Sequence, residues 1–149
     1  MTPAANAGQP RVLRVISAAG LFVDAAIHLD LAHQRPPAPP GASISQVQLF
    51  YAEGIVAMIV AGLLIVSGHR LVYALAVLVA GSALGAVLLY RYCDVGALGP
   101  LPDMYEPFWS NSKLITTIAE AVAVLASSTG LLLSLRPTPT SPVAQLPRT

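Results

Sequence analysis

An apolar segment, residues 17–33, contains four ionisable side chains: Asp24, His28, Asp30 and His33. Ionisable groups are costly in the hydrocarbon of a bilayer, and where they occur there they usually serve a function. Asp24 and His28 are four residues apart and therefore share one face of a helix. Asp30 and His33 lie near the end of the segment, where we expect them at the membrane interface. Asp24 and His28 are the pair whose chemistry needs an explanation.

Two acids in other apolar segments match the depth of this pair. A helix rises about 1.5 Å per residue, which places His28 about 6 Å and Asp24 about 12 Å below the nearer end of their segment. The same rise places Glu53 and Glu120 each about 10 Å below the start of theirs. We therefore expect all four side chains in one polar layer, facing the inside of a helix bundle rather than lipid.

One interpretation of this layer is a metal site. Asp24 and His28 at positions i and i+4 can ligate one ion, and Glu53 or Glu120 can complete its coordination. The Glu-x-x-His pairs of di-iron bundles are absent from the sequence, however, and a single histidine lies clearly within a span.

A second interpretation is a pocket for a small amphipathic ligand such as a quinone. In it, His28, Tyr51 and Tyr90 are hydrogen-bond donors, an acid accepts a proton, and aromatic residues near the same end form a wall. Arg91 is the expected counter-charge of Glu53, Glu120 or Asp94. The candidate ligand-binding residues are therefore Asp24, His28, Tyr51, Glu53, Tyr90, Arg91 and Glu120.

A third interpretation is structural, because polar side chains between membrane helices can simply hold the helices in register. The charges outside this layer, Asp30, Arg35, Asp103 and Glu106, are expected to be solvated. Cys93 is expected to be inert, because a nucleophilic thiol needs a lowered pKa and a paired base.

The composition places these residues in a membrane protein. The chain has 149 residues, of which 55% are hydrophobic and 10% are charged, which is not typical of a soluble domain. Its formal net charge of +1 excludes the dense basic patch of a nucleic-acid-binding protein. The single cysteine cannot form an internal disulfide.

Breaks in the apolar pattern predict an all-α fold, a four-helix transmembrane bundle. Prolines interrupt the chain at 34–43 and again at 93–111, Ser67 and Gly68 form a short break, and Ser45 with Gln48 has capping-box spacing. Ser112 is the expected cap of the last helix. The predicted organisation is a disordered leader at 1–10, a membrane domain at 11–136 with helices at about 12–32, 44–66, 71–92 and 113–135, and a disordered tail at 137–149.

Four spans place both termini on one side of the membrane. The positive-inside rule makes that side the cytoplasm of a multi-pass protein in the plasma membrane. A cleaved signal peptide is the alternative for the first segment, but the segment lacks a clear small-x-small cleavage site. The basic residues on the side of the termini are Arg11, Arg14, Arg70 and Arg136, against Arg35, Arg91 and Lys113 on the other side.

Gly81 and Gly85 have GxxxG spacing, which allows the backbone of a neighbouring helix to approach closely. We expect this contact inside the bundle rather than in a dimer.

The stretch YAEGIVAMIVAGLLIVSGHRLVYALAVLVAGSALG, residues 51–85, resembles the central helix pair of small DoxX-like membrane proteins. These also place an acid early in the second helix and a glycine before a short basic turn. The segment IHLDLAH and the pattern Y-R-Y…G-P-L-P…E-P-F-W…A-E are similar to four-helix membrane proteins of actinobacteria. The resemblance implies quinone-linked oxidoreduction, although the long acidic third loop departs from the compact DoxX pattern.

Two functional hypotheses remain open, and the sequence leaves undecided whether the chain is an enzyme. The first is a small non-catalytic accessory or assembly subunit, whose partners are the lipid bilayer and either another membrane protein or a second copy of the chain. The second is a quinone-linked or metal-dependent membrane oxidoreductase component, with a quinone or a metal ion in the polar layer.

Overall fold

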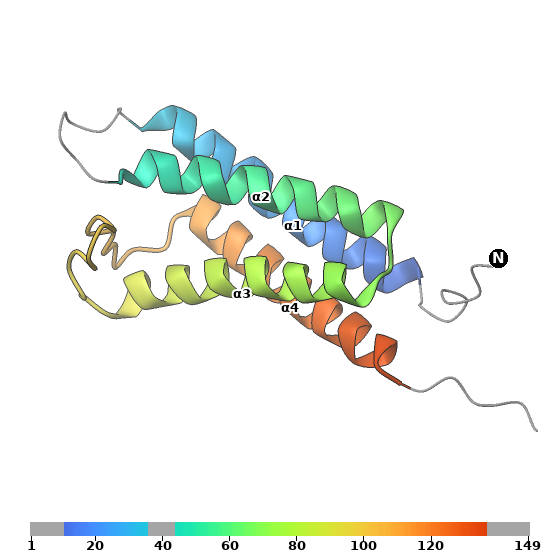
Figure 1. Cartoon of the computed structure of the whole chain (residues 1–149). Coiled ribbons are helices and arrows are strands. Elements are labelled where there is room, and N and C mark those ends of the chain that lie inside the picture. The colour runs from blue at the N-terminus through green and yellow to red at the C-terminus, as the bar shows by residue number, and fades with distance from the viewer. Residues whose placement is uncertain (1–10, 36–43, 137–149) are drawn as a thin grey trace, which may run out of the picture.

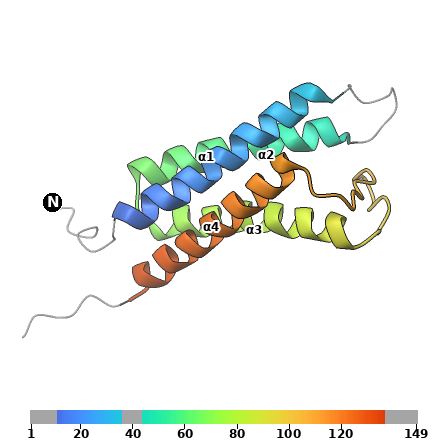
Figure 2. The ribbon, with the colours of Figure 1, turned by 180° about the vertical axis from the view of Figure 1, so that it is seen from behind.

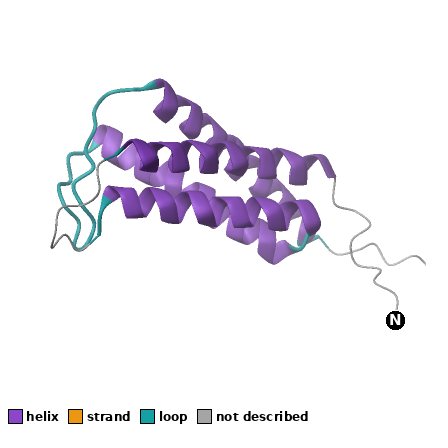
Figure 3. Ribbon diagram, turned by 90° about the horizontal axis from the view of Figure 1, so that it is seen from above, coloured by secondary structure: helices purple, strands orange, loops and turns teal. Residues whose placement is uncertain are grey.

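The computed structural model of the chain describes residues 11–35 and 44–136. These residues form four α-helices, and Figure 3 shows helices and loops alone in this part. Each helix is long and apolar enough to cross a membrane, and their bounds lie within two residues of the predicted ones. The helices are α1 (Arg11–Gln34), α2 (Gln46–Val66), α3 (Arg70–Tyr92) and α4 (Asn111–Ser134) (Figure 1). The predicted leader and tail, at 1–10 and 137–149, lie outside the described residues.

The helix starts follow from local capping chemistry, with one correction. Ser45 and Gln48 form the predicted capping box at the start of α2. The cap of α4 is Ser110, not Ser112, because Ser110 has extended backbone angles and its side chain accepts a hydrogen bond from Lys113 N at 3.2 Å. Residues 110–112 are Ser, Asn and Ser, all good capping types, so sequence alone could not select among them.

The four helices alternate in direction, so α1 begins and α4 ends at one end of the bundle (Figure 1). We call the other end, where α1 and α3 end and α2 and α4 begin, the pocket end. Figure 2 shows α1 and α4 side by side. Gly20 of α1 makes this contact close. A Cβ atom on Gly20 would lie 2.7 Å from Ala119 O and 3.0 Å from Ala123 Cβ. The absence of a side chain at Gly20 is therefore what allows the two helices to meet.

The predicted close packing at Gly81 and Gly85 is wrong. A Cβ on Gly81 would meet a single atom, Val124 Cγ2, at 4.0 Å, and one on Gly85 would meet nothing within 4 Å. The buried face of α3 instead carries Ala76 and Ala80. Gly81 follows Ala80 by one residue, about 100° around a helix of 3.6 residues per turn, so the GxxxG face points away from the core.

At the end of the bundle opposite the pocket end, Arg14 links α1 to α2. Its guanidinium donates to two backbone carbonyls in the last turn of α2, Leu64 O at 2.9 Å and Ile65 O. The last carbonyls of a helix lack partners within the helix, so Arg14 acts as a cap supplied by a neighbouring helix.

Candidate functional site

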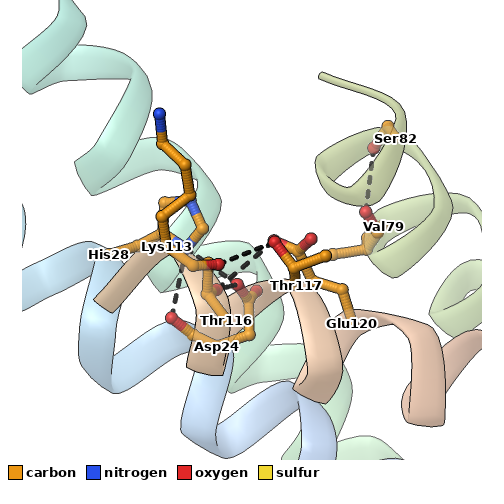
Figure 4. Close-up of polar contacts among 8 residues, drawn as sticks. All are labelled: Asp24, His28, Val79, Ser82, Lys113, Thr116, Thr117 and Glu120. Atoms are coloured by element: carbon orange, nitrogen blue, oxygen red, sulfur yellow. Dashed lines mark hydrogen bonds and ion pairs between the residues drawn. The ribbon is translucent and has the colours of Figure 1, made fainter. Parts of the chain in front are cut away.

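A polar cluster joins α1 to α4 near the pocket end, and we call its four residues, Asp24, His28, Thr116 and Glu120, the Asp–His–Glu cluster. His28 Nδ1 lies 2.8 Å from Asp24 Oδ1 and 3.1 Å from the Asp24 carbonyl oxygen. Thr116 Oγ1 donates to Asp24 Oδ1 at 2.7 Å and lies 3.4 Å from Glu120 Oε1. Figure 4 shows these side chains converging from the two helices. The predicted polar layer thus exists on these two helices.

The carboxylates of this cluster are buried and only partly paired. Asp24 is 0% exposed and Glu120 is 1% exposed. Among residues 11–35 and 44–136, neither Asp24 Oδ2 nor Glu120 Oε2 has a hydrogen-bond partner. A buried carboxylate oxygen without a partner is costly, so the cluster has unused capacity to bind a proton, a polar ligand or a cation.

The three ionisable members of the cluster also lie close enough together to be candidate ligands of one metal ion. One potential ligand atom each from Asp24, His28 and Glu120 lies within 4.8 Å of the other two. Glu53, the fourth ligand considered from the sequence, is not part of this group. The cluster can therefore offer one imidazole nitrogen and two carboxylate oxygens to an ion.

A pocket of about 580 Å³ lies beside the cluster and reaches the pocket end of the bundle. His28, Thr116 and Glu120 line it, and Glu53 and Tyr90 contribute further polar groups. In the described part of the chain, Glu53 Oε1 and the Tyr90 hydroxyl are buried without hydrogen-bond partners. The apolar lining of the pocket includes Leu31, Leu49, Phe50, Ala83 and Val87. A mostly apolar pocket with a few convergent polar groups is typical of a small-molecule site.

Two ordered basic side chains lie at the pocket among its lining residues. The Arg35 guanidinium lies 5.2 Å from the centroid of the Phe50 ring and donates to Gln46 Oε1. Lys113 Nζ pairs with Glu106 Oε2 at 3.0 Å and donates to Glu106 O at 2.8 Å. All five of these residues line the pocket. Glu106 is exposed, as expected for a solvated charge, and Arg35 is partly exposed, but both also belong to the pocket lining.

The loop between α3 and α4 forms part of the pocket wall. Glu106 N donates to Tyr90 O at 3.0 Å, which holds the loop against the end of α3. Earlier in the loop, Leu98 and Leu101 exchange two backbone hydrogen bonds. Between them, Gly99 has φ = 59°, a conformation that favours glycine. Leu101 and Met104 consequently line the pocket.

Two predicted site residues lie elsewhere. The Tyr51 ring packs edge-on against His33, with a centroid distance of 5.5 Å, and is not part of the pocket lining. The Arg91 guanidinium lies 4.9 Å from the Tyr92 ring centroid and 5.4 Å from that of Trp109.

The expected ion pair from Arg91 to Glu53, Glu120 or Asp94 is not formed. The ion pairs within residues 11–35 and 44–136 are His28–Asp24 and Lys113–Glu106. Arg91 follows the pocket residue Tyr90, and the turn of about 100° per residue directs its side chain away from the pocket. The structure thus brings together five of the seven candidate residues: Asp24, His28, Glu53, Tyr90 and Glu120.

Thr116, Arg35, Lys113 and Glu106 are site residues that the sequence interpretation did not select. Thr116 precedes Glu120 by four residues and shares its helix face, a signal that could have identified it. Arg35 and Glu106 lie in connections between helices, where no helical period relates them to the polar layer. The positions of Arg35 and Glu106 beside the pocket could be known only from the folded structure of these connections.

Comparisons with protein-family models, with curated proteins and with solved structures found no match to the chain. The resemblance to DoxX-like proteins accordingly stays a prediction, and the pocket and its cluster carry the functional argument.

Proposed function

We propose that the chain is a multi-pass protein of the plasma membrane that binds a small amphipathic molecule in the pocket. Membrane insertion is supported by large apolar side chains exposed on all four helices. Such surfaces are rare on soluble monomers and are what a bilayer covers. Examples are Phe22, Ile59, Leu78 and Leu125, which are 55%, 57%, 66% and 70% exposed.

The observation that carries the ligand proposal is a pair of pocket groups, Glu53 Oε1 and the Tyr90 hydroxyl, that have no hydrogen-bond partner among the residues the structure describes. A bound molecule with polar atoms at one end would supply their missing hydrogen bonds, and leaving them unpaired costs free energy. The aliphatic lining fits an apolar body or tail. This combination favours an amphipathic ring compound over a purely hydrocarbon ligand.

Within that class we propose a quinone or quinol. A quinone carbonyl accepts a hydrogen bond from Tyr90, and a quinol hydroxyl donates one to Glu53. His28 and Glu120 lie in the same lining and are side chains that transfer protons in general acid–base chemistry. The chain then acts as a component of a membrane oxidoreductase, where the pocket residues bind the ligand and exchange protons with it.

The accessory-subunit hypothesis is the second candidate, and one observation favours it. Within the described residues, the Gly81–Gly85 face of α3 approaches no backbone of another helix, whereas small-xxx-small faces commonly pack on a partner helix in membranes. This hypothesis predicts a co-purifying membrane partner and no saturable binding of a quinone.

Titration of the purified protein in lipid nanodiscs with a short-chain quinone separates the two candidates. We expect saturable binding by the wild type, measured by calorimetry. Tyr90→Phe should weaken binding of the quinone, and Glu53→Leu should weaken binding of the corresponding quinol, each by between about 2- and 12-fold, the value of one hydrogen bond. Tyr51→Phe is the matched control because Tyr51 lies outside the lining, and it should leave affinity unchanged. Non-saturable partitioning, or equal effects of Tyr90→Phe and Tyr51→Phe, would contradict the proposal.

A further inference from the structure

The pocket contains more acidic than basic groups at its inner end. Glu53 and Glu120 line this end and Asp24 lies buried beside it. In the part of the chain that the structure describes, His28 is the basic side chain paired with this group of acids, through its contact with Asp24. Among the described residues, the other basic groups of the lining are engaged at the mouth: Lys113 with Glu106, and Arg35 with Gln46 and Phe50. Buried charge is normally paired or coordinated to a metal, so this group of acids has a partner to be identified.

We propose that Asp24, His28 and Glu120 bind one divalent transition-metal ion. Bonds of about 2.0–2.2 Å to nitrogen and oxygen place two ligands of one ion roughly 3 to 4 Å apart. The candidate atoms lie within 4.8 Å of one another, so small side-chain adjustments bring all three to the ion. The proposal concerns the chain alone and does not depend on a quinone.

The unpartnered oxygens are the observation that supports a bound cation. The contacts of Thr116 and His28 use Asp24 Oδ1, whereas Asp24 Oδ2 and Glu120 Oε2 remain unpartnered in the part of the chain described by the structure. Both belong to side chains at most 1% exposed. A cation between Asp24 and Glu120 supplies these oxygens with a partner and offsets the two negative charges.

The donor set selects the class of ion. Two carboxylates and one imidazole suit borderline ions such as Zn²⁺, Mn²⁺ and Fe²⁺, whereas Mg²⁺ and Ca²⁺ prefer sites made of oxygen alone. Three protein ligands leave coordination positions open. Because His28 and Glu120 line the pocket, the open positions face it and are accessible to water or to a bound molecule.

Thr116 would hold the ligand Asp24 in place through its hydrogen bond to Asp24 Oδ1, without binding the ion itself. Residues that hydrogen-bond to metal ligands orient them, and the loss of such a residue typically lowers metal affinity by about 10- to 100-fold. Thr116→Val should therefore weaken binding within that range, although the side chain does not itself ligate.

The test is metal binding by the full-length protein in detergent, after treatment with a chelator and dialysis against Zn²⁺ with millimolar Mg²⁺ present. We expect one Zn²⁺ per chain by elemental analysis. X-ray absorption of the loaded wild type should show one imidazole nitrogen among oxygen ligands. A spectrum that shows two imidazole ligands or none would overturn the proposal, and so would the absence of bound Zn²⁺ at micromolar concentration. Neither result depends on a variant.

Variants then assign the site. Glu120→Gln and His28→Ala should each weaken binding at least 10-fold, the lower end of the loss for a residue that hydrogen-bonds to a metal ligand. His33→Ala is the matched control, since His33 lies on the same helix but is exposed and contacts Leu29 O at 2.7 Å. Stoichiometric binding that survives in both cluster variants, or is lost in His33→Ala, would refute the assignment. Circular dichroism confirms folding, and if either variant is unfolded the absorption measurement on the wild type decides.

Discussion

Thr116 provides the hydrogen bond that links the acid of α1 to α4. We predict that Thr116→Val lowers the free energy of unfolding by about 1–3 kcal/mol, because a buried carboxylate loses a donor. Thr117→Val is an adjacent control, since Thr117 Oγ1 donates at 2.6 Å to Lys113 O within its own helix. Chelator-treated protein unfolded in detergent supplies the measurement. Equal losses in the two variants would show that the link between helices has no special value.

The residues inside helices were largely predictable from sequence, and those outside were not. The structure brings Asp24, His28 and Glu120 together. This meeting is predictable because the depth and the helix face of each residue can both be calculated from a period of 3.6 residues. The predicted ion pair of Arg91 is wrong because Arg91 follows Tyr90 by one residue, which directs its side chain towards Trp109. The ion pair of Glu106 with Lys113 depends on how the loop folds, which no periodic pattern determines.

At the scale of the helix, Gly20 sets the distance between α1 and α4. We predict that Gly20→Ala destabilises the bundle by about 1–3 kcal/mol, the usual cost of overpacking. The added Cβ would lie 2.7 Å from the backbone atom Ala119 O, which cannot move without shifting α4. Thermal unfolding in detergent measures the effect.

Gly62→Ala is the control for this prediction. Gly62 lies within α2, and a Cβ there would meet nothing within 4 Å. The change should be neutral or stabilising by up to about 1 kcal/mol, because alanine favours helix over glycine. If Gly62→Ala is as harmful as Gly20→Ala, the contact between α1 and α4 is not the cause.

The same helices show why a glycine motif is a weak guide to packing. The spacing of Gly81 and Gly85 is that of a contact motif, yet Gly20, Gly54 and Gly130 make the close approaches, to Ala119, Leu29 and Tyr73 respectively. Close packing depends on which face of each helix the other helices cover. That choice follows from the whole set of buried residues, not from two glycines.

At the scale of the molecule, the four helices and their alternation follow from apolar length and from the breaks between them, two of which contain prolines. Orientation is a separate matter, for which the bias of Lys and Arg is the physical guide. Our proposal of cytoplasmic termini places the pocket end, with the loop between α3 and α4, outside the cytoplasm. A quinone or metal ion would then enter the pocket from that side.

Cys93 makes this orientation measurable, because it is the single cysteine of the chain, is exposed, and caps α3 at the pocket end. We expect a membrane-impermeant maleimide to label it in intact cells. The matched variant combines Cys93→Ser with His69→Cys, which places the thiol in the exposed turn at the other end of the bundle. It should be labelled only after permeabilisation. The reverse pattern would place the pocket on the cytoplasmic side, and labelling of both proteins in intact cells would contradict a spanning bundle.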